Sequence, residues 1–395
     1  MNNERTNEKN GEKLYDYSLL APGPVNLHPD VRQALALPMI HHRTPQFDEI
    51  LKRVLTRLKL VFGTDQAVYM HSSTGSGGME SLLVNVLSPE DQVLVVISGK
   101  FGERWAEMAE AFGAHITTLS VPWGESVNPQ VVREALEKNP KIRAVLCQAC
   151  ETSTGALHPI QELGLIISKF PNCLFLVDGI TAVGAFPLPM DEYKIDGLVA
   201  GSQKAFMLPT GLAFVSFSQK AQARFSEAKM KRYYFDIRRE QKANLQGETF
   251  FSSSVILVRA LDVVLDLILA KGLPTLYEEI QNRAQLTRHI APLLGFKIYP
   301  HCPSNSLTAL TVPAGVDGQQ VRAYLEKHYS ITIMGGQDQA KGKIIRIGHM
   351  GYILPQEMDS LFECLALTLA ALNHPVSPVA LLQATAAIRT QGKNT

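Results

Sequence analysis

The sequence predicts an α/β fold, with a large domain built on a mostly parallel sheet that is sandwiched by helices and a smaller C-terminal α+β domain. Up to about residue 255, short β-rich runs alternate with stretches of helical periodicity. The β-rich runs are apolar at nearly every position, which is typical of parallel strands buried on both faces. Beyond that point, long amphipathic helices are separated by shorter strands.

The elements follow in order along the chain. A helix is expected over residues 48–61, because six apolar side chains recur there at helical spacing. The expected strands of the large domain cover 92–97, 143–149, 173–177, 197–200 and 212–217, and helices cover 79–86, 103–112, 129–137 and 160–170. The C-terminal part is expected to have helices at 255–270, 276–293, 318–328 and 355–372 and strands at 307–312 and 343–348.

These patterns divide the chain into four parts. Residues 1–17 are polar and are expected to form a flexible N-terminal extension. The large domain is expected over 18–260 and the small C-terminal domain over 261–376. Residues 377–395 form a tail whose role the sequence does not indicate.

Composition narrows the class of function. Of the 395 residues, 46% are hydrophobic and 19% are charged, which permits a large core and excludes wholesale disorder. The formal net charge of +1 gives no reason to expect a nucleic acid or membrane surface as partner. The start of the chain lacks the apolar core of a secretory signal, and acidic and basic residues interrupt the most apolar helix, 255–270. We therefore expect a cytoplasmic protein that acts on small molecules.

Five cysteines do not suggest a disulfide framework. Cys147 and Cys150 have the CxxC spacing, but no second pair or histidine cluster completes a zinc site. Because they adjoin an apolar run, we expect buried strand cysteines and no metal site.

A glycine-rich turn is the first candidate for chemistry. The run STGSGG at 73–78 leads directly into the helical pattern. Glycines allow close backbone approach, and the free N–H groups at a helix start bind anions, so a phosphate group is the expected ligand. An ordinary turn is the alternative, and the run matches neither the dinucleotide fingerprint nor a Walker loop.

Two charged residues follow apolar strands. Asp178 ends one strand, where it is either a turn residue or a carboxylate with a buried partner. Lys204 closes the next apolar strand, where partial burial would lower its pKa and make the amine a nucleophile toward a carbonyl. A lysine reaching from the strand end to solvent is the alternative. A phosphate cradle, a carboxylate for a protonated pyridine nitrogen and a lysine for a Schiff base together fit pyridoxal phosphate.

The chain also resembles the class V, fold-type I pyridoxal-phosphate aminotransferases, in the alanine–glyoxylate and serine–pyruvate (serine–glyoxylate) branch. The resemblance covers nearly everything beyond the first 17 or so residues, and the segment around Lys204 is its most specific part. It implies a seven-stranded sheet of the pyridoxal-phosphate transferase type. The matching motifs are APGP (21–24), HRTPQF (42–47), TGSGGME (74–80), GKFG (99–102), ETSTG (151–155), VDG (177–179), GSQKA (201–205) and RIG (346–348).

The resemblance implies a role for each matching cofactor residue. Lys204 forms the Schiff base with the cofactor and moves the proton during catalysis. Asp178 keeps the pyridine nitrogen protonated, Phe101 stacks on the ring, and Ser153 lies near its phenolic edge. The phosphate contacts are Thr74, Gly75, Ser76 and Gln203, with Ser252 contributed by a neighbouring subunit.

The substrate side is expected to depend on Arg346. This arginine matches the one that binds the substrate carboxylate in the family, and its strand is too apolar for an idle charge. The backbone at Ala21 and Gly23 is expected to approach the same carboxylate. His41, His42 and Arg43 form a local cluster for which solvated or structural roles are at least as good an interpretation as substrate contact.

The resemblance implies a ping-pong transaminase that acts as a homodimer with shared active sites. It would move an amino group from alanine or serine to glyoxylate or pyruvate. One alternative is a lyase or cysteine desulfurase on the same fold, which usually has histidines where this chain has Gln203 and Phe101, and which would need a mobile cysteine such as Cys302. The other is a non-catalytic family member in a redox assembly.

Overall fold

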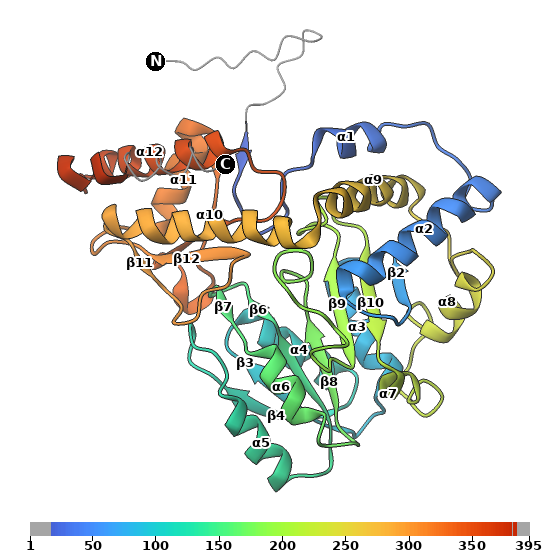
Figure 1. Ribbon diagram of the computed structural model, residues 1–395. Helices are drawn as coiled ribbons and strands as arrows, with labels where there is room; N and C mark the ends of the chain where they lie inside the picture. The colour runs from blue at the N-terminus through green and yellow to red at the C-terminus, as the bar shows by residue number, and fades with distance from the viewer. Residues whose placement is uncertain (1–16, 381, 385–395) are drawn as a thin grey trace.

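The computed structural model describes residues 17–380 and 382–384. The expected extension at 1–17 therefore lies outside the described residues except for Tyr17, as do position 381 and the part of the tail from 385. Figure 1 shows two lobes, a larger one around a sheet flanked by helices and a smaller one that carries the C-terminal helices.

A seven-stranded sheet forms the centre of the large lobe, with the strand order β2-β10-β9-β8-β5-β3-β4. Six strands run in one direction and only β10 runs opposite to them, so the sheet is mostly parallel, as predicted. The strands are β2 (Val68–His71), β3 (Gln92–Ile97), β4 (His115–Ser120), β5 (Ile142–Gln148), β8 (Leu174–Asp178), β9 (Gly197–Gly201) and β10 (Ala213–Phe217).

Helices cover both faces of this sheet because both faces are apolar. One hydrophobic core lies under α1 (Pro29–Leu35), α2 (Pro45–Phe62), α5 (Pro129–Lys138), α6 (Ile160–Ile167) and α9 (Val255–Lys271). A second core lies under α3 (Gly75–Val86), α4 (Lys100–Ala111), α7 (Gln219–Gln222) and α8 (Ile237–Asn244). The α2 helix illustrates the local rules. It begins after Thr44, whose hydroxyl accepts the N–H of Phe47, and it ends at Gly63 with φ +60°.

The small lobe is built on a four-stranded antiparallel sheet with the strand order β11-β12-β15-β14. Its strands are β11 (Lys297–Ile298), β12 (Leu307–Thr311), β14 (Met334–Gly335) and β15 (Ile344–Gly348). A third core packs α10 (Leu273–Leu293), α11 (Gly318–Tyr329) and α12 (Pro355–Ala371) against it. The first described strand, β1 (Ser18–Leu19), pairs with β13 (Ile331–Thr332), so the first described residues lie at the small lobe.

The predicted division at 260/261 falls inside α9. The buried side chains of this helix as far as Ile268 pack into the core of the large lobe. Since β1 and Leu20 pack with the small lobe, both lobes contain segments from beyond the predicted bounds. We propose that the division lies after Lys271.

The topology brings the candidate residues to one edge. The parallel strands β8 and β9 are neighbours, so the residues that follow their carboxyl ends meet at the same edge of the sheet. The strand β2 runs in the same direction as β9, because both are antiparallel to β10. Its carboxyl end leads into α3, which brings the glycine-rich turn to that edge.

Candidate active site

A cavity opens at this edge and collects most of the predicted residues. Its empty volume is about 450 Å³. Eleven residues line it: Thr74, Gly75, Ser76, Phe101, Arg104, Thr152, Asp178, Ile180, Thr181, Gln203 and Lys204.

The glycine-rich turn forms one end of the cavity. Thr74 is the N-cap of α3, but its side chain makes no capping hydrogen bond. The first intrahelical bond of α3 runs from Gly78 N–H to Thr74 C=O, so the N–H groups of Gly75, Ser76 and Gly77 lack helical partners. A Cβ on Gly75 would lie 2.6 Å from Ile180 Cδ1, so a larger residue at this position would require the Ile180 side chain to shift. This end is built to bind an anion.

Gln203 presents its amide group to the same cavity. Its Oε1 atom is buried and has no hydrogen-bond partner among the described residues. The oxygen and nitrogen of an amide exchange places by a half-turn, so this group can offer N–H to a phosphate oxygen. An orphaned buried amide is costly unless a ligand satisfies it. The residues at this end therefore fit the phosphate of pyridoxal phosphate.

Asp178 lies at the base of the cavity. It is 6% exposed, and the Ile180 N–H donates to its Oδ1 over 2.8 Å. Burial raises the pKa of the carboxyl to about 6, and the Ile180 hydrogen bond opposes this effect. A cationic partner such as a protonated pyridine nitrogen would stabilise the ionised form.

Lys204 follows β9 and reaches the loop before α1. Its Nζ donates to Pro22 C=O over 2.7 Å. Burial lowers the pKa of the amine to about 8, and the charge of Asp178 opposes this. Gly23 has φ +111°, and a Cβ there would lie 2.4 Å from Nζ, so the loop packs directly on the amine. Ala21, 2% exposed, precedes this contact and lies next to Gly348 of β15.

Phe101 and Ser153 have different positions relative to the cavity. Phe101, in the first turn of α4, forms part of its wall. Ser153 is fully buried and is not among the lining residues. Its hydroxyl donates to Glu151 over 2.5 Å and accepts the Lys100 N–H over 3.1 Å. The hydroxyls that line the cavity here are those of Thr152 and Thr181, 3.0 Å apart.

Glu151 is a buried carboxylate that the sequence reasoning missed. It accepts the N–H groups of Phe101 and Gly102 over 3.1–3.3 Å and the Nε2 of Gln148 over 3.1 Å. Burial raises its pKa, while the hydrogen bonds from Ser153, Gly102 and Phe101 oppose this shift. Since all of these partners donate, they stabilise the ionised form. Glu151 thus fixes the start of α4, and with it Phe101.

Arg346 extends from β15 of the small lobe toward the large lobe. It is 6% exposed, its NH1 donates to Thr152 C=O over 2.8 Å, and its Nε donates to Gly335 C=O over 3.0 Å. Burial lowers its pKa to about 10, so it keeps its charge at neutral pH. Within the described part of the chain, no carboxylate lies within 4.0 Å of its guanidinium. A buried cation that has only carbonyl partners is a strong site for a substrate carboxylate.

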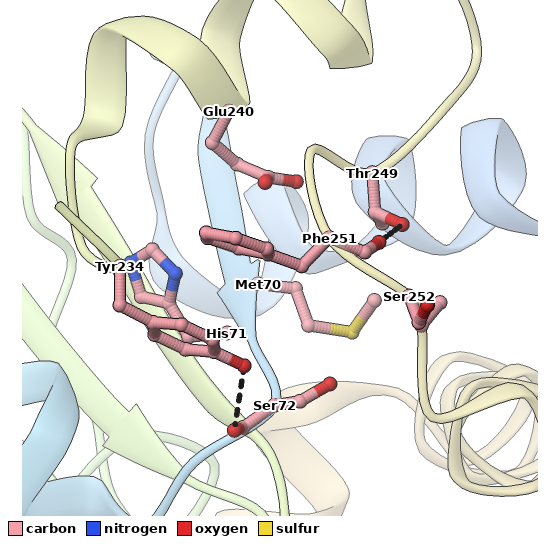
Figure 2. A pocket seen from close by; sticks show the side chains of 9 residues that line it. Met70, His71, Ser72, Tyr234, Glu240, Thr249, Phe251 and Ser252 are labelled. Atoms are coloured by element: carbon pink, nitrogen blue, oxygen red, sulfur yellow. Dashed lines mark hydrogen bonds between the residues drawn. The ribbon is translucent and has the colours of Figure 1, made fainter.

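Ser252 lies in a different place from the other predicted residues. It is exposed and lines a second, smaller hollow with Thr249, Phe251 and Tyr234, which Figure 2 shows beside the buried His71. The local cluster near the start of α2 is also separate from the cavity lining. Arg43 pairs with Glu248, and His41 stacks on His42.

Arg104 lines the cavity and is a charged residue that the sequence reasoning also missed. It lies one helical turn after Phe101 on α4, and its guanidinium carbon is 4.9 Å from the centre of the Phe101 ring. Its NH1 donates to Ser76 Oγ over 3.2 Å. The spacing of three residues after Phe101 was the signal that could have revealed it, because such residues share a helix face.

The cysteines do not gather at the cavity. Cys147, Cys150 and Cys173 are buried, as expected for the first two. Cys302 is exposed, but its segment is tied to the large lobe, since its C=O accepts Leu157 N–H over 2.8 Å. In the described ranges, no group of three or more histidine, cysteine, aspartate or glutamate side chains is placed to hold a metal ion. No described helix combines the length and apolarity needed to cross a membrane.

Comparison with known proteins identifies the family of this chain. The class-V aminotransferase family profile matches residues 31–360. The L-aspartate–glyoxylate aminotransferase of Paracoccus denitrificans is 35% identical over 366 residues, which cover 91% of this chain and 92% of that protein. The soluble hydrogenase 42 kDa subunit of Anabaena cylindrica is 33% identical over 360 residues, covering 90% of this chain and 94% of that protein.

Solved structures share the whole architecture. An alanine–glyoxylate aminotransferase from Nostoc sp. superposes with a TM-score of 0.87 at 29% identity, covering 93% of this chain and 98% of that chain. The predicted fold and cofactor are thereby confirmed. The chain belongs to the class-V aminotransferase family, and it is a pyridoxal-phosphate-dependent enzyme that moves an amino group between an amino acid and a 2-oxo acid.

Proposed function

We propose that this enzyme takes the amino group of a small amino acid, alanine or serine, and gives it to a small 2-oxo acid, glyoxylate or pyruvate, in two half-reactions. The observation that carries the proposal is that the site has two cations, Lys204 in the cavity wall and Arg346 hydrogen-bonded to Thr152 of the same wall. Arg346 is buried and Lys204 is partly buried, and the charge of Arg346 contributes to lowering the pKa of Lys204. An α-amino acid has a carboxylate that Arg346 can bind and a Cα proton that Lys204 can remove.

Each residue of this site has a distinct task in the proposal. Arg346 binds the substrate carboxylate with the N–H groups that Thr152 and Gly335 leave free. Lys204, whose pKa is lowered to about 8, would take the proton from the substrate Cα and would return it across the intervening nitrogen, at the carbon that the cofactor contributes. Asp178 keeps a proton on the pyridine nitrogen. When bound there, pyridoxal phosphate accepts the electron pair that the Cα proton leaves behind.

The choice of substrates follows from the relatives. The names of the Paracoccus and Nostoc enzymes share glyoxylate as the acceptor and differ in the donor, aspartate or alanine. We therefore place glyoxylate first among the acceptors. Aspartate joins alanine and serine as a donor to be tested.

A second copy of the chain would complete the cofactor site. Ser252 is exposed, and aromatic side chains surround it: Tyr233 is 65% exposed, Tyr234 is 44% exposed, and Phe251 stacks on Tyr234. An exposed aromatic cluster is typical of an interface. We propose a homodimer in which Ser252 of each copy serves the phosphate site of the other, in the cytoplasm.

The experiment that tests the function is isotope transfer. Purified enzyme receives ¹⁵N-labelled alanine, serine or aspartate together with glyoxylate, and NMR follows the label. The proposal expects labelled glycine from alanine or serine, and none from Lys204→Ala protein. Release of free ammonia without labelled glycine would contradict it.

Mixed dimers test the shared site. Lys204→Ala and Ser252→Ala proteins, each weak alone, should regain activity after they exchange subunits, because one of the two sites then has both residues intact. Failure to regain activity, or a monomer in sedimentation, would contradict the dimer proposal but not the transamination.

A further inference from the structure

Arg104 is a cation in the cofactor cavity to which the reaction described above assigns no task. Its guanidinium lies between the Phe101 ring, at 4.9 Å, and Ser76 Oγ, at 3.2 Å. Its charge also reaches the reacting groups, since it contributes to lowering the pKa of both Asp178 and Lys204. In the part of the chain that the structure describes, no carboxylate lies within 4.0 Å of it.

Arg104 lies where the surrounding groups favour the binding of an anion. Ser76 is the second residue of α3, so the guanidinium lies at the start of that helix, beside N–H groups without helical partners. The helix start offers only partial charges, and the orphaned Gln203 amide is neutral. A phosphate monoester carries nearly two negative charges at neutral pH, so these neutral donors leave most of its charge uncompensated. Arg104 is the full positive charge at this end of the cavity.

We propose that Arg104 binds the phosphate group of the cofactor and is the main counter-charge for it within one subunit. The inference depends on pyridoxal phosphate binding in this cavity. The planar guanidinium has five N–H donors, of which one is used on Ser76, so the rest can form a two-pronged contact with phosphate oxygens. Because the guanidinium also lies over the Phe101 ring, Arg104 would fix the position of this ring relative to the phosphate group.

The competing interpretation is that Arg104 only steadies Phe101. The two interpretations differ in what they predict for a cofactor without a phosphate. Pyridoxal has the same ring and aldehyde as pyridoxal phosphate but a hydroxyl in place of the phosphate ester. If Arg104 binds the phosphate, its loss weakens the binding of pyridoxal phosphate alone. If Arg104 only supports Phe101, its loss weakens the binding of both compounds equally.

The experiment measures the dissociation constants of pyridoxal phosphate and pyridoxal by absorbance titration of cofactor-free protein. The variants are Arg104→Gln, which removes the charge, and Arg104→Lys, which keeps the charge but loses the fork. The control is Lys100→Gln on the same helix, whose side chain pairs with Glu103 and Asp338 and does not line the cavity.

For Arg104→Gln we expect the dissociation constant of pyridoxal phosphate to rise about 10- to 100-fold, while that of pyridoxal changes less than about 3-fold. Arg104→Lys should fall between Arg104→Gln and the wild type, and Lys100→Gln should match the wild type for both compounds. Equal losses for the two compounds, or no loss for either, would overturn the proposal. If the wild type binds neither compound, the function proposed above is wrong instead, so the two failures are distinguishable. Retained pyridoxal binding also shows that the variant is folded.

Discussion

The two sheets each supply the active site with one cation, and the two cations differ in acidity. The large sheet presents Lys204 beyond the end of β9, and burial lowers its pKa to about 8. The small sheet presents Arg346 from β15, and burial lowers its pKa only to about 10. The lysine therefore exchanges its proton readily near neutral pH, while the arginine remains charged. The comparison shows how loss of solvent lowers the pKa of both groups but leaves only the arginine permanently charged, which fits the proposed base on one lobe and the proposed carboxylate receptor on the other.

Hydrogen bonds of the two cations, Arg346 and Lys204, connect the two lobes at the active site. Arg346 donates to Thr152 of the large lobe, and Lys204 donates to Pro22 in the loop that starts from the small lobe. Each cation thus donates to a carbonyl group on a segment that comes from the other lobe. Substrate binding and the position of the lobes should be coupled through these two contacts.

Removing the base should have the largest effect. Lys204→Arg keeps the charge but raises the pKa out of reach, so transamination should fall by at least about 10⁴-fold. Steady-state assays with alanine and glyoxylate measure this. The control is Lys220→Arg, because Lys220 pairs with Asp196 at the opposite end of β9. Near-normal turnover of the Lys204 variant would remove the lysine from catalysis.

Removing the carboxylate receptor should act mainly on binding. For Arg346→Gln, the KM of both the amino acid and the 2-oxo acid should rise about 100-fold, because a charge-assisted contact of about 2–3 kcal/mol is lost. The matched control is Arg288→Gln in the same lobe, whose guanidinium contacts Asn305 and Pro303. The control should lower stability and leave KM unchanged. An unchanged KM in Arg346→Gln would show that the carboxylate binds elsewhere.

Crowding the lysine should have an intermediate effect. Gly23→Ala places a Cβ against Lys204 and imposes φ +111° on alanine, so cofactor affinity should drop at least about 10-fold. Gly315→Ala is the control, because Gly315 has φ +82° but no atom within 4 Å of the added Cβ. Both variants should lose about 1 kcal/mol or more of stability in denaturant unfolding. Equal cofactor affinity in the two variants would contradict the packing of this loop on Lys204.

The smallest expected effect is a shift in pH dependence. Only the neutral amine of Lys204 reacts with an aldehyde. Since its pKa is lowered to about 8, the capture rate of pyridoxal phosphate should rise about tenfold per pH unit below pH 8 and level off above it. Stopped-flow absorbance from pH 7 to 10 measures the rate, with Nα-acetyl-lysine and pyridoxal phosphate as the reference reaction. A rate that keeps rising to pH 10 would indicate an unperturbed lysine.

Most of the framework was predictable from apolar patterns. The expected strand at 92–97 coincides with β3, and the expected helix at 255–270 ends one residue before α9 does. The strand β4 was not predicted, because it lies at the sheet edge, its side chains are largely exposed, and threonines replace the apolar run. The strand β2 was also missed, since it is only four residues long.

Within the site, residues at strand ends were predictable and supporting residues were not. Asp178 ends an apolar strand and Lys204 follows one, which makes both visible in the sequence. Glu151 and Arg104 act through contacts that depend on folding, with the α4 backbone for the first and with Ser76 on α3 for the second. Their hydrogen-bond partners lie about 30 to 50 residues away in the sequence, so a local sequence pattern does not reveal these contacts.

The most direct test of the two-cation site is a reversible half-reaction in a single turnover. Pyridoxal-phosphate-loaded enzyme is mixed with L-alanine in a stopped-flow instrument, and glyoxylate is added afterwards. The predicted result is that the absorbance of the bound cofactor shifts with alanine and returns with glyoxylate, and that Lys204→Ala and Arg346→Gln proteins respond far more slowly. An absorbance unchanged by alanine, serine or aspartate, or a change that glyoxylate and pyruvate do not reverse, would contradict it.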